Sequence, residues 1–150
     1  MHSLAGVDII TSKSRILPGM MPEEVVVLRE WLKRHEGEYD RVFGNIRIGA
    51  GTDPGEGFPE EVRRGAILNT QKRIDALAYK GDQATIVEVK RRAGMSAVGQ
   101  VLGYVQLYIA ENPRMPAPSA LLVAAASDSD ALTFAGSVRV ATETIEGLFP

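Results

Sequence analysis

Two β-like runs joined by a short polar turn constrain the fold of this chain more than any other feature. Residues 73–79 and 84–90 are both β-like runs of mainly apolar side chains, with charged residues at 73, 75, 88 and 90, and Gly81-Asp82 lies at the centre of the turn between them. This pattern predicts a β-hairpin closed by a two-residue loop. Such a loop fixes the register of the strands, so Asp75 is expected directly opposite Glu88.

The predicted register gathers charged side chains on one side of the hairpin. Because side chains alternate between the two faces of a strand, we expect Asp75, Glu88 and Lys90 to share one face. The other face is filled by Ile74, Ala76, Val87 and Val89. Opposed carboxylates, with Cβ atoms roughly 5 Å apart, repel each other unless a divalent cation lies between them or one stays protonated. The alternation alone is also typical of any solvent-facing strand.

Two carboxylates and an ammonium group at one sheet edge suit the hydrolysis of phosphodiesters. The carboxylates hold a metal, which lowers the pKa of its bound water and offsets the charge of the transition state. Lys90 orients the water or the anionic transition state. The chain has no cysteine and only two histidines, so a metal would need oxygen ligands, and this favours Mg²⁺ or Mn²⁺.

The remaining patterns predict one mixed α/β domain, residues 1–150, with helices on both sides of a mixed sheet. The length of 150 residues is typical of a single domain. Residues 1–20 are expected to form a loose N-terminal arm or an edge strand. The expected elements are helix 22–35, strand 39–48, helix 59–68, the hairpin, helix 95–112, strand 120–125, helix 131–135 and strand 138–142. The Gly-rich loop 49–59 is expected to gate the site or contact substrate.

Two of the predicted helices carry further candidate residues. Gln100 and Tyr104 lie one helical turn apart beside an apolar stripe, where an amide and a phenol can bind phosphate or orient the carboxylates. A half-buried helix flank accounts for the same pattern. Glu24 lies within the apolar arc of the first helix, and burial of an unpaired carboxylate is costly. A metal or a lysine would be its partner; a first-turn glutamate favoured by the helix dipole is the alternative.

The charge pattern narrows the partners of the chain. A net charge of −2 excludes nucleic-acid binding by bulk positive charge. The basic residues form local clusters that bracket the hairpin: Arg63-Arg64, Lys72-Arg73 and Lys90-Arg91-Arg92. These clusters predict a funnel for phosphates, with a solvated edge as the alternative. No apolar run approaches the ~20 residues that span a bilayer, and no secretory signal is visible, so we expect a cytoplasmic protein without a membrane partner.

The order of these residues resembles the PD-(D/E)XK nuclease superfamily, and within it the RecB-like and NucS-like branches. The resemblance rests on Asp75, then Glu88-Val89-Lys90, then the Q-x3-Y motif of Gln100 and Tyr104. It covers residues 73–108, about a quarter of the chain. The proline that names the family is absent, since Ile74 precedes Asp75. The resemblance implies a restriction-endonuclease-like αβββαβ core.

The resemblance also implies roles for individual residues. Asp75 and Glu88 would bind Mg²⁺ or Mn²⁺, with the backbone carbonyl of Val89 as a further ligand. Glu24 is our candidate for the acidic residue that the first helix often adds. Lys90 would position the attacking water. Gln100 and Tyr104 would shape the site and touch DNA, and the basic residues Lys72, Arg73, Arg91 and Arg92 are further expected DNA contacts.

Three hypotheses follow from the sequence. In the first, the protein is a metal-dependent deoxyribonuclease acting on single-stranded, ended or branched DNA, alone, as a homo-oligomer or recruited by a protein partner. In the second, it is a catalytically silent nuclease-fold module for DNA binding or assembly, for example in a phage or mobile-element particle. In the third, the motif is accidental, the hairpin turn is longer than two residues, and Asp75 and Glu88 face different sides.

Overall fold

A six-stranded mixed sheet forms the centre of the computed structural model, which describes residues 7–8 and 19–150. The strands lie side by side in chain order: β1 (Val7–Asp8), β2 (Arg41–Ile48), β3 (Lys72–Lys80), β4 (Gln83–Ala93), β5 (Ser119–Ser127) and β6 (Ala141–Thr144). Neighbours from β1 to β4 are antiparallel, whereas β4, β5 and β6 run parallel. The predicted mixed sheet is confirmed.

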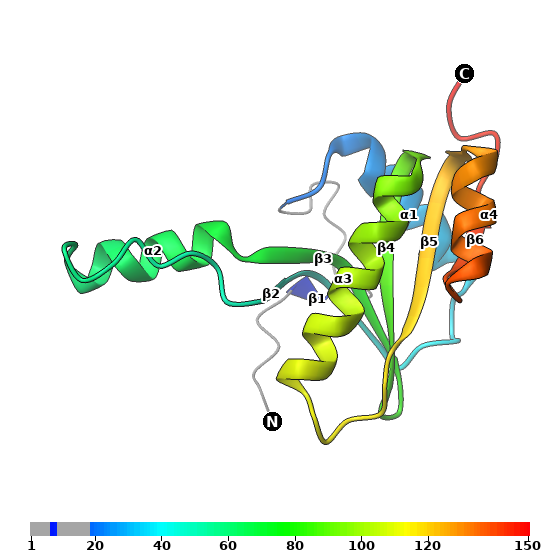
Figure 1. Ribbon diagram of the computed structural model, residues 1–150. Coiled ribbons are helices and arrows are strands. Elements are labelled where there is room, and N and C mark those ends of the chain that lie inside the picture. The colour runs from blue at the N-terminus through cyan, green and yellow to red at the C-terminus, as the bar shows by residue number, and fades with distance from the viewer. Residues whose placement is uncertain (1–6, 9–18) are drawn as a thin grey trace.

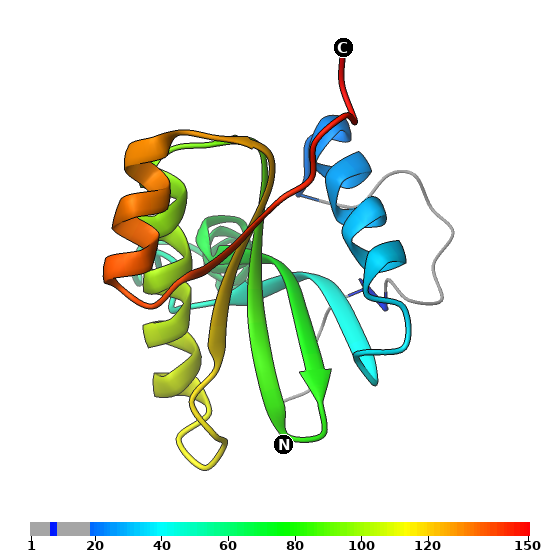
Figure 2. The same cartoon turned by 90° about the vertical axis from the view of Figure 1, so that its right-hand side faces the viewer.

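Helices cover both faces of the sheet, as predicted. Helix α1 (Pro22–Arg34) packs on one face, while α3 (Met95–Glu111) and α4 (Ser129–Ser137) pack on the other (Figure 2). The order α1-β2-β3-β4-α3-β5 is the expected αβββαβ core. Helix α2 (Glu60–Thr70) is inserted between β2 and β3 and projects away from the rest of the molecule (Figure 1).

Local sequence explains where the helices begin. Pro22 opens α1, and acidic residues in its first turn and basic residues in its last turn match the helix dipole. Asp128 caps α4, because its side chain accepts a hydrogen bond from the backbone N–H of Asp130 at 2.9 Å. Asp128 therefore ends the turn after β5 and begins α4.

The hairpin has the predicted two-residue loop. Tyr79 pairs with Ala84 and Lys80 with Gln83, which leaves Gly81 and Asp82 at the tip. Gly81 has a φ of 59°, a left-handed conformation that glycine adopts at little cost at the first central position of a type II′ turn. The longer turn expected under the accidental-motif hypothesis is wrong.

Apolar side chains form one buried cluster on each side of the sheet. On the α1 side, Val27, Leu28 and Trp31 pack against strand residues that include Ala76, Val87 and Val89. On the α3 side, Val98 and Val101 pack against the other cluster. Ile74 belongs to this second cluster, so its expected place with Ala76 is wrong. The ladder between β2 and β3 skips the pair at Asn45, whose φ is 56°, and the alternation of faces changes at this interruption.

The last strand and the N-terminal segment can be compared with their predicted bounds. The last strand begins at Ala141 rather than at residue 138, because Val138 caps the end of α4 and Arg139 turns the chain with a φ of 60°. At the N-terminus, β1 is an edge strand that pairs Val7 with Gly44. The rest of the expected arm, residues 1–6 and 9–18, lies outside the described residues. In the described part of the chain, no helix has the length and apolarity that a membrane span requires.

Candidate active site

Strands β3 and β4 bring three of the predicted site residues together. Asp75 is the residue of β3 before the Ala76–Val87 pair, and Glu88 and Lys90 follow on β4. An Asp75 carboxylate oxygen, Oδ2, accepts a hydrogen bond from the backbone N–H of Val89 at 2.9 Å. The Nζ atom of Lys90 lies 3.3 Å from Oε1 of Glu88. The convergence of these side chains contradicts the different faces expected under the accidental-motif hypothesis.

Glu88 is buried although it carries an ionisable group. Its exposed fraction is 2%, and within residues 19–150 it is the one charged residue in the buried class. Lys90 contacts Oε1, but Oε2 is buried and has no hydrogen-bond partner among the described residues. A buried carboxylate oxygen without a partner is strongly unfavourable unless a proton or a cation compensates it.

The pKa values of the two carboxyl groups rise for the same main reason. Burial raises the pKa of Glu88 to about 8, the charge of Asp75 adds to this rise, and Lys90 opposes it. Burial likewise raises the pKa of Asp75 to about 6, while the N–H of Val89 opposes the rise. Near neutral pH the pair therefore retains a proton, which the two carboxyl groups can share through a hydrogen bond.

Tyr104 lies beside the carboxylates, and Gln100 is exposed one helical turn before it. The Tyr104 side chain is half-buried, and its pKa is raised to about 12 by burial and by the charges of Glu88 and Asp75. Its hydroxyl therefore stays protonated and can donate a hydrogen bond. Gln100 is exposed, and its side chain makes no hydrogen bond to the residues that the structure describes. Tyr104 thus interacts electrostatically with the carboxylates, and the role of Gln100 stays a prediction.

Glu24 approaches the site from α1. It is half-buried, its charge contributes to the raised pKa of Asp75, and its Oε2 accepts a hydrogen bond from the backbone N–H of Met21 at 3.1 Å. Over the described ranges, no three His, Cys, Asp or Glu side chains are grouped closely enough to hold a metal ion. Glu24 therefore does not form a three-carboxylate cluster with Asp75 and Glu88, and its role as a ligand stays a prediction.

The predicted basic residues differ in how far they are free to meet a ligand. Arg91 donates to Glu23 at 2.7 Å, and its guanidinium lies 4.7 Å from the centre of the Phe149 ring. The guanidinium group of Arg73 donates a long hydrogen bond, 3.5 Å, to Oδ1 of Asn45. Lys72 and Arg92 are exposed and form no ion pair with the described residues.

Arg47 is a further basic residue near the site that was not among the predicted ones. It is exposed on β2 and pairs with Arg73 in the ladder between β2 and β3. The alternation of polar and apolar residues in 41–48 was the available signal. Arg47 extends the basic end of β3 by one strand, so the cationic edge is wider than the clusters in the sequence indicate.

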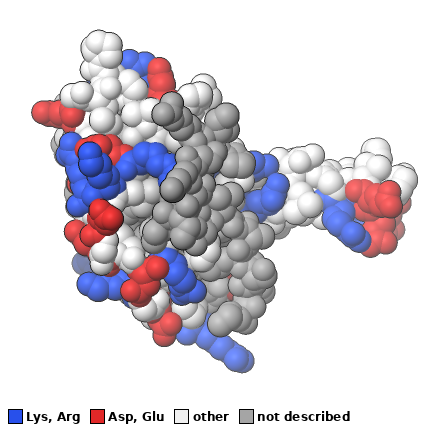
Figure 3. Space-filling view, turned by 180° about the vertical axis from the view of Figure 1, so that it is seen from behind, with Lys and Arg blue, Asp and Glu red and all other residues white. Residues whose placement is uncertain are grey.

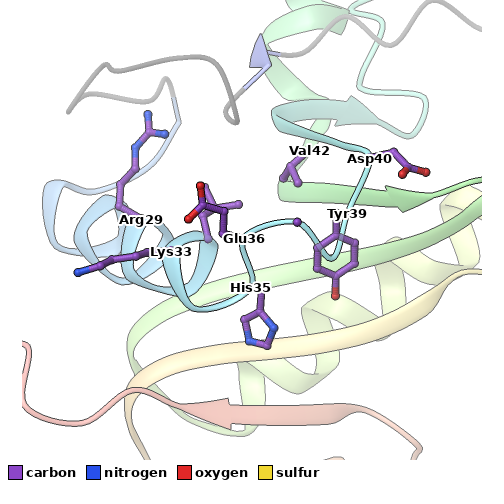
Figure 4. Close-up of a pocket in the computed structure, with 9 residues that line it drawn as sticks. Arg29, Lys33, His35, Glu36, Tyr39, Asp40 and Val42 are labelled. Atoms are coloured by element: carbon purple, nitrogen blue, oxygen red, sulfur yellow. The ribbon is translucent and has the colours of Figure 1, made fainter.

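A separate hollow of about 470 Å³ lies beyond the end of α1 (Figure 4). Arg29 and Lys33 of α1 line it together with Tyr39 and Asp40, and none of the predicted site residues does. His35 also lines the hollow. Its Nδ1 atom lies 2.8 Å from Oε2 of Glu38, and its Nε2 atom lies 2.9 Å from Oε2 of Glu143 in β6. These contacts tie the end of α1 to the last strand, and the hollow is distinct from the carboxylate pair.

Comparison with known proteins supports the fold. No family profile and no curated protein sequence matches this chain. A crystal structure of a repair endonuclease from Pyrococcus abyssi is similar with a TM-score of 0.50 and 19% identity, over 85% of this chain and 47% of that one. The chain thus spans about half the length of that protein, and at this identity the likeness shows the fold.

Two further solved structures are similar at lower scores. One is a complex of EndoMS with double-stranded DNA, with a TM-score of 0.49 and 15% identity over 90% of this chain and 49% of that one. The other is a protein of unknown function, AF1548, with a TM-score of 0.48 and 11% identity over 80% of this chain and 56% of that one. The α/β fold itself rests on the order of helices and strands and on the likeness to the repair endonuclease.

Proposed function

We propose that the protein is a metal-dependent nuclease that hydrolyses phosphodiester bonds of DNA. The observation that carries this proposal is the pair of the half-buried Asp75 and the buried Glu88, with an unpartnered Glu88 oxygen and the Lys90 ammonium group beside it. Two oxygen donors in this setting suit Mg²⁺ or Mn²⁺. The fold shared with a repair endonuclease supports the proposal.

The surroundings of each site residue suit a particular role in this reaction. Asp75 and Glu88 would hold the cation, with the Val89 carbonyl and Glu24 as further candidate ligands. Bound there, a divalent cation supplies positive charge to the transition state and lowers the pKa of water. The Lys90 ammonium group orients the water or the phosphate oxygens. The Tyr104 hydroxyl, which stays protonated, donates a hydrogen bond toward the carboxylates or the substrate.

A silent DNA-binding or assembly module is the second hypothesis, and the energetics disfavour it. A module without catalysis has no physical need for two carboxyl groups whose pKa values are raised by burial and mutual repulsion. Calorimetric titration with Mn²⁺ separates the two hypotheses. We expect binding that disappears in Asp75→Asn and Glu88→Gln, whereas a silent module shows no binding that depends on these residues.

Cleavage assays test the activity directly. Wild-type protein with Mg²⁺ or Mn²⁺ is expected to cleave DNA, and single-stranded, double-stranded, flapped and branched substrates should be compared. Glu88→Ala and Lys90→Ala are expected to lower the rate by at least about 10²-fold. Asp82→Asn, at the exposed tip of the same hairpin, is the matched control and should keep the wild-type rate. Absence of cleavage of every substrate with both metals would contradict the proposal.

A further inference from the structure

Residues 49–71 form an arm that stands away from the body of the protein. An extended segment runs outward from β2, and α2 runs back to β3 (Figure 1). None of the residues of α2 is buried. An isolated helix of this length, 11 residues, is marginal in water. The arm therefore needs stabilising contacts, and the described part of the protein supplies only some of them.

One face of α2 is held by polar contacts with the extended segment. Arg63 donates two hydrogen bonds to Asp53 at 2.9 and 2.6 Å. The backbone N–H of Thr52 donates to the hydroxyl of Thr70 at 2.6 Å. The backbone of Gly51 also lies against the carbonyl of Ile67, too close for any side chain at position 51. Residues 63, 67 and 70 thus define the inner face of α2.

The opposite face of α2 is open and partly apolar. Helical geometry places Glu61, Val62, Gly65, Leu68 and Asn69 on this outer face. Val62 is 49% exposed and Leu68 is 42% exposed, and the neighbouring Phe58 is 51% exposed. Outside the backbone of α2 itself, no described atom lies within 4 Å of the position that a Cβ at Gly65 would take. No contact with the described residues thus explains a glycine that weakens the helix by about 1 kcal/mol.

We propose that the outer face of α2 binds the same face of a second copy of this chain, as an antiparallel helix pair that crosses at Gly65. Positions 62 and 68 are equally distant from 65, so Val62 meets Leu68 of the partner subunit. Positions 61 and 69 are also equally distant, so Glu61 meets Asn69 of the partner subunit. This self-complementarity is what a two-fold symmetric interface requires. The missing Cβ at Gly65 lets the two backbones approach.

The charges of the arm favour the same arrangement. At its outer end, Glu56 and Glu61 form no ion pair with described residues, and at its root the same is true of Arg47 and Lys72. Figure 3 shows red at the outer end of the arm and blue where the arm joins the body. An antiparallel crossing places the acidic end of each arm near the basic root of the other. Opposite charges therefore meet at both ends of the pair.

DNA fits the arm less well than a second copy does. The arm carries four acidic residues and two arginines, and these arginines, Arg63 and Arg64, already pair with Asp53 and Glu60. An acidic outer end repels phosphates. The helix face is short, and interfaces below about 1,200 Å² of buried surface belong to weak complexes. We therefore expect a reversible dimer with a Kd on the order of micromolar.

Sedimentation velocity of the full chain, from about 1 μM to about 1 mM, tests this proposal in the range where such a dimer dissociates. We expect a concentration-dependent shift from monomer to dimer. Gly65→Gln should raise the Kd at least about tenfold through a clash at the crossing, although it favours the helix itself. Gly136→Gln, at a glycine of α4 that likewise has no described atom near its Cβ position outside its own helix, is the matched control and should leave the Kd unchanged.

Charge reversal tests the orientation of the pair. Glu56 lies at the outer end of the arm and Arg47 lies in β2 at its root, so the antiparallel pair brings Glu56 toward the partner subunit's Arg47. Glu56→Lys and Arg47→Glu should each weaken the dimer several-fold, and the double variant should restore it.

Three outcomes would overturn the proposal. They are a wild-type protein that stays monomeric at every concentration, an unchanged Kd in Gly65→Gln, or arm variants that impair DNA binding while the oligomeric state is unaltered. The proposal does not depend on nuclease activity, because sedimentation measures association without a substrate.

Discussion

A carboxylate inside a protein is stable only when another group compensates its charge. At Glu88 the compensation is partial: Lys90 contacts one oxygen, and the other has no partner among the described residues. The raised pKa values of Glu88 and Asp75 are the direct result. The proposed metal would have to displace the retained proton, so its binding would couple stability to function at these two residues.

Glu88→Gln separates the stability of the site from its function. Near pH 8, the pKa of Glu88 in the folded state, the wild-type protein loses stability because the buried carboxyl group must ionise. Glutamine has nearly the same shape and no charge. We predict that this variant is more stable than the wild type at pH 8 without metal, by on the order of 1–3 kcal/mol, as measured by urea unfolding.

The pH dependence supplies the control for this variant. Near pH 4, where the carboxyl group is protonated in both folded and unfolded chains, the two proteins should differ by less than about 1 kcal/mol. A Glu88→Gln variant that is less stable than the wild type at pH 8 would show that the carboxylate is already compensated in the folded protein.

At the scale of elements, the hairpin shows what sequence could predict and why. Turn chemistry at Gly81-Asp82 and the β-like composition of both strands are local properties, and together they set the register that brings Asp75 to Glu88. The bounds of β6 are not set by local sequence. Its start at Ala141 depends on parallel pairing with Leu121 of β5, so the strand expected at 138–142 began three residues too early.

Two other features could not be predicted from the sequence, the exposure of Gln100 and the direction of α2, because they depend on helix rotation and on tertiary contacts. Spacing places Gln100 one turn before Tyr104, but the packing of Val98 and Val101 sets the rotation of α3 and leaves Gln100 exposed. The sequence likewise predicted a helix near residues 59–68, and α2 forms there. That α2 stands away from the sheet depends on contacts that no local pattern encodes.

The length of the hairpin loop is predicted to control the site. One glycine inserted between Gly81 and Asp82 shifts the register that two-residue loops enforce, and a shift by one residue turns a side chain to the opposite face. We expect this insertion to abolish Mn²⁺ binding, measured by calorimetry, because Asp75 and Glu88 no longer converge. A glycine inserted between Arg114 and Met115, in the loop before β5, is the control and should preserve binding.

The effect of the glycine insertions on secondary structure can also be measured. Far-ultraviolet circular dichroism should show that both insertion variants keep their helices and strands. Mn²⁺ affinity in the hairpin variant within about threefold of the wild type would mean that the metal does not depend on the pairing of these two strands.

For the whole molecule, pH and metal are expected to act against each other. Burial lowers the pKa of His35, but hydrogen bonds to Glu143 and Glu38 outweigh it, and the net pKa is raised. Groups with raised pKa values hold more protons in the folded chain than in the unfolded chain. Stability from His35, Asp75 and Glu88 is therefore present at low pH and is lost as the pH rises through their folded pKa values.

We therefore predict that the Tm of the metal-free protein falls between pH 5 and pH 8, where Asp75 and Glu88 titrate with pKa values of about 6 and about 8. Mn²⁺ requires the ionised carboxylates, so it should raise the Tm more at pH 8 than at pH 5. At about 100 times its Kd, one metal adds about 2.7 kcal/mol. Differential scanning calorimetry with and without Mn²⁺ measures both effects.

Two variants separate the contribution of His35 to the fall in Tm with pH from the contribution of Glu88. His35→Gln should remove the part of the decline that Mn²⁺ does not reverse, because His35 contacts Glu38 and Glu143 rather than the carboxylate pair. Glu88→Gln should remove the part that Mn²⁺ does reverse. An equal rise in Tm with Mn²⁺ at pH 5 and pH 8 would mean that binding releases no proton, and the ions would then bind at groups other than Asp75 and Glu88.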